Sequence, residues 1–230
     1  MTSPRLVIFD CDGTLVDSQH VIVAAMEHAF AAAGLAAPER EAVLSIVGLS
    51  LPEAITRVKE AHAIPHDAAL LHRLLEGYKG AFTKLRLDPA HEEPMFPGAR
   101  DGVLALSDRD DVVLGIATGK SRRGVDRLIR MRGLEGCFAT VQTADDAPSK
   151  PHPGMVEQAM DETGASRPAT LMVGDTTFDI QMAVNAGVRA IGVDWGYHPA
   201  AALHEAGADM VVEDFTALLA AIDGHREAAE

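Results

Sequence analysis

The sequence predicts an α/β fold with a doubly wound, parallel-sheet, Rossmann-like core and an inserted α-helical domain. Short apolar runs rich in β-branched residues recur along the chain, and helical patterns separate most of them. The alternation is interrupted once, near the N-terminus. Strands that alternate with helices are typical of a parallel sheet with helices on both faces.

The first strand is predicted at Arg5 to Phe9, where the letters RLVIF form a buried run. Similar runs predict further strands at 112–116, 139–142, 170–173, 190–193 and, more weakly, 210–212. Helical patterns lie at about 99–107, 121–132, 153–163, 177–186, 199–206 and 214–221. These elements predict a Rossmann-like core built from residues 1–16 and 93–230.

The stretch 17–92 breaks the alternation. It carries helical patterns at about 18–33, 39–46, 52–62 and 67–86, without a convincing strand. A turn or loop is predicted where the chain returns to the core, at Pro94, Pro97 and Gly98. We therefore predict that 17–92 is a separate helical domain inserted after the first strand.

Composition limits the classes of function. The 230 residues carry a formal net charge of −14, and a phosphate backbone needs clustered positive charge, so we expect no nucleic-acid partner. No apolar run reaches the roughly 18 residues of a spanning helix, so we expect no membrane partner. The chain has two cysteines and starts without a signal-peptide pattern, which predicts a cytoplasmic location.

The first chemical cluster, Asp10-Cys11-Asp12-Gly13-Thr14, follows the first predicted strand. Ligands of open α/β sheets bind at the carboxyl ends of strands, and alternation points Asp10 and Asp12 the same way. Two close carboxylates are unfavourable unless a cation or a shared proton compensates. One could bind metal and attack phosphorus while the other protonates the leaving oxygen. The plainer interpretation is an Asp-Gly turn with a solvated aspartate.

Two further clusters also follow predicted strands. The hydroxyl of Thr118 and the backbone N–H of Gly119 could hold a phosphate oxygen, although Thr118 or Ser121 could instead cap the next helix. Lys150 stands before Pro151 in a stiffened turn and could neutralise a nucleophile and phosphoryl oxygens. Most lysines are solvated surface charges, so each of these clusters is ambiguous alone.

The last cluster places Asp175 at a strand end and Asp179 on the first turn of the next helix. Mg²⁺ prefers oxygen ligands and usually keeps several waters, so Asp10, Asp175 and one backbone carbonyl would suffice, with Asp179 as outer support. An acidic first turn with an Asp N-cap is the alternative. All four clusters lie at carboxyl ends of predicted strands, so they could converge on one crevice.

The order of these clusters resembles the four motifs of the haloacid dehalogenase superfamily, and the helical insertion is similar to that family's C1-type cap. Within the family, the phosphoglycolate phosphatase group is the most similar. The segments that carry this similarity are Asp10-Cys11-Asp12-Gly13-Thr14-Leu15-Val16-Asp17-Ser18, Ser149-Lys150-Pro151-x-Pro153 and Asp194-Trp195-Gly196-Tyr197.

The resemblance implies a role for each matching residue. Asp10 would be the nucleophile and a metal ligand, and Asp12 the general acid/base, giving its carbonyl to the metal. The phosphoryl group would be bound by Thr118 and Lys150. The metal would be ligated by Asp175 and its site supported by Asp179.

The activity implied is a Mg²⁺-dependent phosphatase that hydrolyses small phosphorylated metabolites, such as phosphoglycolate or sugar phosphates, through an aspartyl phosphate on Asp10. The alternatives are a β-phosphoglucomutase-like phosphomutase, a pyrophosphatase and a non-catalytic Mg²⁺-binding domain. Related mutases carry a histidine where this chain has Ile22, which disfavours the first. Dehalogenases of the family lack an acid two residues after the nucleophile, so the presence of Asp12 disfavours dehalogenation. Asp12 also favours turnover over a non-catalytic domain that stores an acyl phosphate. Gly119 replaces an asparagine common in the phosphoglycolate group, which leaves the substrate open.

The segment Val47 to Glu53 resembles the cap specificity loop of the family. Gly48 would allow close approach and Ser50 could contact the leaving group, with Gly13 and Thr14 on the core side of the substrate. The same segment predicts a capping box, with Ser50 as N-cap and Glu53 at N3.

The sequence does not decide between a monomer and a homodimer.

Overall fold

The computed structural model describes residues 4–88 and 91–227 and contains one sheet of six parallel strands in the order β3-β2-β1-β4-β5-β6. The strands are β1 Arg5–Phe9, β2 Val112–Thr118, β3 Thr140–Thr143, β4 Thr170–Gly174, β5 Arg189–Val193 and β6 Met210–Val212. Every residue of β1 and β4 is buried, as expected of parallel strands between two helical layers. The predicted α/β fold is confirmed, with strand ends shifted by two residues at most.

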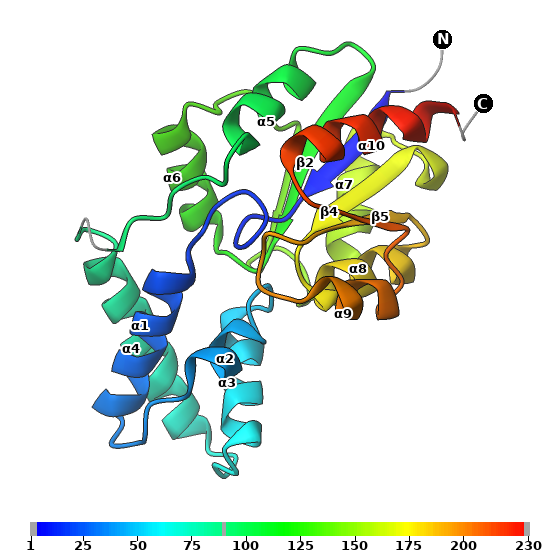
Figure 1. Cartoon of the computed structure of the whole chain (residues 1–230). Coiled ribbons are helices and arrows are strands. Elements are labelled where there is room, and N and C mark those ends of the chain that lie inside the picture. Colours follow the sequence, from blue (N-terminus) through cyan, green and yellow to red (C-terminus); the bar gives the residue numbers. More distant parts are fainter. Residues whose placement is uncertain (1–3, 89–90, 228–230) are drawn as a thin grey trace.

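Helices cover both faces of this sheet (Figure 1). They are α5 Ala99–Ser107, α6 Arg122–Arg132, α7 Gly154–Thr163, α8 Thr177–Ala186, α9 Ala200–Glu205 and α10 Phe215–Glu227. Successive residues of β1 serve opposite faces, because side chains alternate along a strand. Val7 and Phe9 join a cluster that includes residues of α5 and α10, and Leu6 and Ile8 join one that includes residues of α7 and α8. The core is therefore doubly wound.

In the described residues between β1 and α5, the chain forms four α-helices, which we call the helical insertion. They are α1 Gln19–Ala32, α2 Arg40–Leu44, α3 Leu51–Ala61 and α4 Ala68–Leu85. They gather beside the sheet (Figure 1) around their own hydrophobic cluster, which includes Phe30, Ile55 and Leu74. The four predicted helices are therefore present, and the boundary of the inserted domain at 17 and 92 stays a prediction. No helix in the described ranges is long and apolar enough to cross a membrane.

The predicted capping box at α3 is wrong. Ser50 is the N-cap residue, but its side chain makes no capping hydrogen bond. Glu53 instead pairs with Arg57 at 3.0 Å, and the backbone N–H of Ser50 donates to Ser149 Oγ at 2.8 Å. A tertiary contact between the helical insertion and the core therefore replaces the local one.

Candidate active site

The chemically active residues of the four sequence clusters meet at the carboxyl ends of β1, β2 and β4. Asp10 follows β1, Thr118 ends β2 and Asp175 follows β4, while Lys150 precedes α7. All four side chains are buried. The structure thus brings these residues together as their order in the chain predicts, and protein covers their side chains.

Lys150 holds two of the acids together. Its Nζ donates to Asp10 Oδ1 at 2.7 Å and to Asp179 Oδ1 at 2.5 Å, and all three residues are buried. Burial alone would lower the pKa of Lys150, but the two carboxylates outweigh it and raise that pKa above its usual value. Lys150 is therefore a permanent positive charge beside Asp10.

Asp179 is positioned by the start of α8. Its Oδ2 accepts from the backbone N–H of Thr176 at 3.0 Å and from the Thr176 hydroxyl at 2.6 Å. The backbone N–H of Asp179 in turn donates to the Thr176 hydroxyl oxygen at 3.4 Å, and the two bonds from backbone N–H groups form a capping box. The N-cap is therefore Thr176 and not Asp175. Both oxygens of Asp179 are occupied, one by Lys150 and one by Thr176, which fits a supporting role.

Asp175 is fixed on both sides. Its Oδ1 accepts from the hydroxyl of Thr14 at 2.9 Å, and its Oδ2 accepts from the backbone N–H of Tyr197 at 2.9 Å. A Cβ on Gly13 or on Gly196 would lie 2.1 Å from an atom of this side chain, so only glycine fits there. Burial raises the pKa of Asp175 well above its usual value, and the charges of Asp179 and Asp10 raise it further.

The acids also suit a divalent cation. Asp10, Asp175 and Asp179 each offer a carboxylate oxygen, and these oxygens lie within 4.8 Å of one another. Asp10 Oδ2 is buried and has no hydrogen-bond partner in the described part of the chain. Burial raises the pKa of Asp10 to about 6, although Lys150 opposes the shift. Three carboxylates with one lysine leave excess negative charge, and hard oxygen donors are those that Mg²⁺ prefers. The residues therefore fit Mg²⁺.

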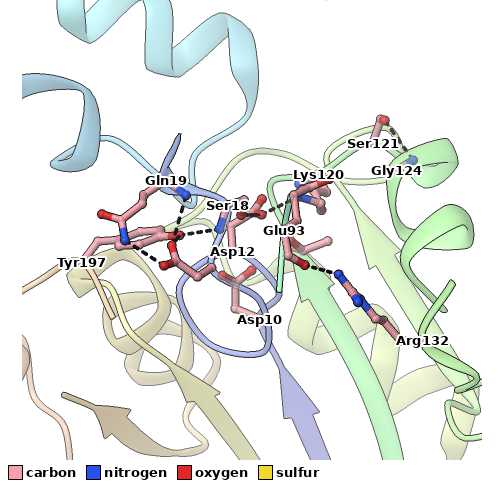
Figure 2. A network of polar contacts seen from close by, with 12 residues as sticks. Asp10, Asp12, Ser18, Gln19, Glu93, Lys120, Ser121, Gly124, Arg132 and Tyr197 are labelled. Carbon is pink, nitrogen blue, oxygen red and sulfur yellow. Dashed lines mark hydrogen bonds and ion pairs between the residues drawn. The ribbon is translucent and has the colours of Figure 1, made fainter. Parts of the chain in front are cut away.

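Asp12 belongs to a different network, which sequence reasoning missed (Figure 2). Its Oδ1 accepts from the hydroxyl of Ser18 and from Lys120 Nζ. Lys120 also pairs with Glu93 at 3.0 Å, and these carboxylates raise the pKa of the lysine despite its burial. The position of Lys120 two residues after Thr118 was a signal in the sequence. Glu93 had none, because its partner comes only from the tertiary fold.

The loop before α3 lies directly on the core. A Cβ on Gly119 would lie 2.5 Å from the carbonyl oxygen of Leu49 and 2.6 Å from that of Gly48. The missing side chain at Gly119 therefore lets this loop approach the end of β2. Ser121, not Thr118, caps α6, since its hydroxyl accepts from the backbone N–H of Gly124 at 3.3 Å.

A cavity of about 730 Å³ lies between the helical insertion and the core. Asp12, Gly48, Ser50 and Gly119 line it, together with residues of α4 and α6. The more deeply buried acids around Lys150 are not among its lining residues. Asp12 is therefore the acid of the site that faces the cavity.

Two aromatic residues after β5 hold the loop that follows β1. Trp195 Nε1 donates to the carbonyl oxygen of Thr14 at 3.1 Å, and its ring packs against Phe96 and Phe215. The Tyr197 hydroxyl accepts from the backbone N–H of Ser18 at 2.9 Å. Both residues thus support the loop that carries Asp10 and Asp12.

The class that the fold and the site define is a doubly wound α/β protein with clustered acids at its strand ends and a helical insertion beside them. The family model of haloacid dehalogenase-like hydrolases matches residues 7–193, so the chain belongs to this family.

Curated relatives extend the match to nearly the whole chain. The Probable phosphatase IndB of Dickeya dadantii is 36% identical and covers 94% of this chain and 92% of its own. The Phosphoglycolate phosphatase of Pseudomonas putida is 31% identical, with coverages of 95% and 79%. The Pyrophosphatase PpaX of Oceanobacillus iheyensis is 30% identical, with coverages of 92% and 94%. These relatives confirm the predicted enzyme class, a phosphatase of the family.

A solved structure shows the same fold. The hydrolase from Pseudomonas syringae has a TM-score of 0.84 at 26% identity, and the match covers 96% of this chain and 98% of that one. The match leaves out only 4% of this chain, so the two chains share their architecture beyond the sheet.

Proposed function

We propose that this protein is a Mg²⁺-dependent phosphatase that hydrolyses small phosphate monoesters through an aspartyl phosphate on Asp10. The observation that carries the proposal is the state of Asp10, whose Oδ1 is held by Lys150 while the buried Oδ2 has no partner in the described residues. An unpartnered carboxylate oxygen in a buried acidic cluster is costly unless it binds a cation or reacts.

The residues around Asp10 supply the binding of the phosphoryl group. Lys150 carries the positive charge nearest the nucleophile, and Thr118 and the backbone N–H of Gly119 are hydrogen-bond donors at the adjacent strand end. The ion would be held by Asp10, Asp175 and the carbonyl of Asp12, with Asp179 in support. When bound, Mg²⁺ offsets negative charge on the phosphoryl oxygens and on the acids.

Asp12 is our candidate for the general acid/base, because it is the acid that lines the cavity. Its hydrogen bonds from Ser18 and Lys120 both go to Oδ1, which leaves Oδ2 for proton transfer. Asp12 would protonate the leaving alkoxide as Asp10 attacks phosphorus. It would then take a proton from the water that hydrolyses the aspartyl phosphate.

Phosphoglycolate and sugar phosphates are the substrates we favour, and inorganic pyrophosphate is a second candidate, because a pyrophosphatase is among the relatives. A phosphomutase is disfavoured by Ile22. This residue lines the cavity, and an isoleucine side chain cannot transfer a proton.

The test is phosphate release from phosphoglycolate, glucose 6-phosphate, pyrophosphate and p-nitrophenyl phosphate, with Mg²⁺ and with EDTA. We expect Mg²⁺-dependent release that falls by about 10³-fold or more in Asp10→Asn, since the nucleophile is lost. Asp126→Asn, at an exposed acid of α6, is the matched control and should behave as wild type. Folded protein that releases no phosphate from any substrate, or an Asp10→Asn variant that stays active, would contradict the proposal.

A further inference from the structure

The cavity extends well beyond Asp12, along one face of α6 and past the end of α4. Its lining residues on α6 include Arg123, Arg127 and Met131, which span more than two helical turns. Its lining residues also include Phe82 and Arg86 at the end of α4. The far part of the cavity is therefore shaped by the helical insertion and the core together.

Three arginines that line this part of the cavity form no ion pair with a described residue. Arg123 and Arg127 lie four residues apart on α6 and so share one face of that helix, and Arg86 approaches from α4. No carboxylate lies within ion-pair distance of these three guanidinium groups in the described ranges. Arg86 Nε is buried and has no hydrogen-bond partner in the same part of the chain. Such a group is costly to bury unless a ligand satisfies it.

The other cations that line the cavity already have partners. Lys120 pairs with Asp12 and Glu93, and Lys79 pairs with Glu76 at 3.1 Å. Arg132 donates to the backbone carbonyl of Glu93. The three unpaired arginines therefore differ from their neighbours, and they do so in a protein whose net charge is −14.

The charges of the three arginines also interact. Burial lowers the pKa of Arg86 below its usual value, and the nearby charge of Arg127 lowers it further, with a smaller contribution from Arg123. Glu93 opposes this shift, but it is already engaged by Lys120. Of the acids that line this part of the cavity, Asp145 accepts from the backbone N–H of Arg122 at 2.8 Å. Asp88 and Glu92 also line the cavity, but in the described residues neither forms an ion pair with one of the three arginines.

We propose that Arg86, Arg123 and Arg127 form a subsite for a second anionic group of the substrate, either a carboxylate or a phosphate. This inference rests on the proposed phosphatase function and specifies its substrate class. Arg127 lies five residues into α6, roughly 7 Å along the helix axis from its start. Since Arg123 and Arg127 lie on α6 and the transferred phosphoryl group would lie at Asp10, we expect a carbon skeleton between that group and the second anion.

The first experiment compares substrates with and without a second anion. The kcat/KM values for fructose 1,6-bisphosphate and 3-phosphoglycerate are each divided by that for p-nitrophenyl phosphate. We expect these ratios to fall by about tenfold or more in Arg86→Gln/Arg127→Gln, mainly through KM, because charge-assisted hydrogen bonds to the second anion are lost. The substrate with the larger loss shows whether the subsite prefers phosphate or carboxylate.

Arg130→Gln is the matched control. It removes the same charge from α6, but Arg130 is exposed and is not among the lining residues, so we expect wild-type ratios. Each single variant is measured as well, and all variants are checked for wild-type thermal unfolding. Ratios that stay unchanged in every folded variant of Arg86 and Arg127 would overturn the subsite.

A binding measurement separates the failure of the subsite from the failure of the proposed function. Fructose 1,6-bisphosphate is titrated calorimetrically into Asp10→Asn protein, with and without the two arginine substitutions. We expect about tenfold weaker binding without the arginines. Equal affinities would overturn the subsite alone. A wild-type protein that hydrolyses none of the substrates, p-nitrophenyl phosphate included, would overturn the proposed function whatever the binding result.

Discussion

The end of β1 and the far end of the cavity have opposite imbalances of charge. Around Asp10, three buried carboxylates offer oxygens that lie within 4.8 Å of one another, and Lys150 pairs with two of them, Asp10 and Asp179. Between α4 and α6, three arginines face a cavity without a paired carboxylate in the described residues. The first region fits a cation and the second an anion. In the proposed function, the strand ends carry the chemistry, and in the proposed subsite, the border with the helical insertion selects the substrate.

The largest effect should follow from removing the one cation of the acidic region. Lys150→Met leaves Asp10 and Asp179 buried without their counter-charge. We expect phosphate release to fall by about 10³-fold or more, and the free energy of unfolding in urea to fall by about 3–5 kcal/mol without Mg²⁺.

Lys79→Met is the control for this prediction. It breaks a pair with Glu76 in which both side chains are more than half exposed, and such pairs contribute about 1 kcal/mol or less. If Lys150→Met and Lys79→Met lowered the free energy of unfolding equally, then the buried lysine would contribute no more to stability than the exposed one.

A smaller effect is expected from Lys120→Met, which removes one of the two groups that orient Asp12. We expect kcat for glucose 6-phosphate to fall by about 10- to 100-fold, because its alkoxide leaving group needs a positioned acid. The loss for p-nitrophenyl phosphate should be smaller, since nitrophenolate leaves without protonation.

Lys84→Met, at an exposed lysine of α4, is the control for Lys120→Met and should change neither rate. If both substrates lose the same factor in Lys120→Met, then Lys120 does not act through Asp12.

The contact between the loop before α3 and the core can be broken with one methyl group. Gly119→Ala places a Cβ against the carbonyl oxygens of Gly48 and Leu49. We expect the free energy of unfolding to fall by about 1–3 kcal/mol, as in other overpacked sites, and KM to rise as the loop moves.

Gly80→Ala makes the same change within α4, where nothing lies within 4 Å of the new atom, and should stabilise the protein by about 0.5–1 kcal/mol. The close approach at Gly119 would be refuted if urea denaturation showed that both variants change the free energy of unfolding in the same direction.

The smallest effect concerns an ion-pair network at the opposite end of the sheet from Asp10. Asp111 pairs with Arg5 at 2.8 Å and with Arg109 at 3.0 Å, and the hydrogen bond from Arg109 holds its pKa well below the usual value. A carboxyl group whose pKa is lower in the folded than in the unfolded protein stabilises the fold at pH values above its unfolded pKa, which is about 4 for aspartate. This stabilisation is lost as the pH falls from that value towards the folded pKa.

The measurement is the difference in unfolding free energy between wild type and Asp111→Asn. We expect it to shrink as the pH falls from about 5 towards 3. A difference that stays constant over this range would mean that the network contributes nothing through the charge of Asp111.

The sequence predicted the sheet and the acidic region because both depend on local patterns. Each buried strand is a short apolar run, and Asp10, Thr118 and Asp175 lie at or directly after the ends of such runs. Parallel strands bring their carboxyl ends together, so the residues there converge without further information.

The cavity could not be predicted in this way. Arg86 belongs to the helical insertion and Arg127 to the core, and no periodicity connects them. Glu93 meets Lys120 for the same reason only after folding. The capping box at Ser50 failed because the backbone of Ser50 bonds to Ser149, a residue far along the chain. Local rules are weakest where the helical insertion touches the core, which is also where substrate selection is proposed.

The indole of Trp195 gives this protein a built-in optical reporter. It is the only tryptophan of the chain, and its Nε1 is hydrogen-bonded to the carbonyl oxygen of Thr14, on the loop that carries Asp10 and Asp12. Its emission therefore arises from a single place and is sensitive to the polarity and packing beside that loop. Recording this emission during additions of Mg²⁺ or inorganic phosphate would follow binding in unlabelled protein, before any bond is made or broken.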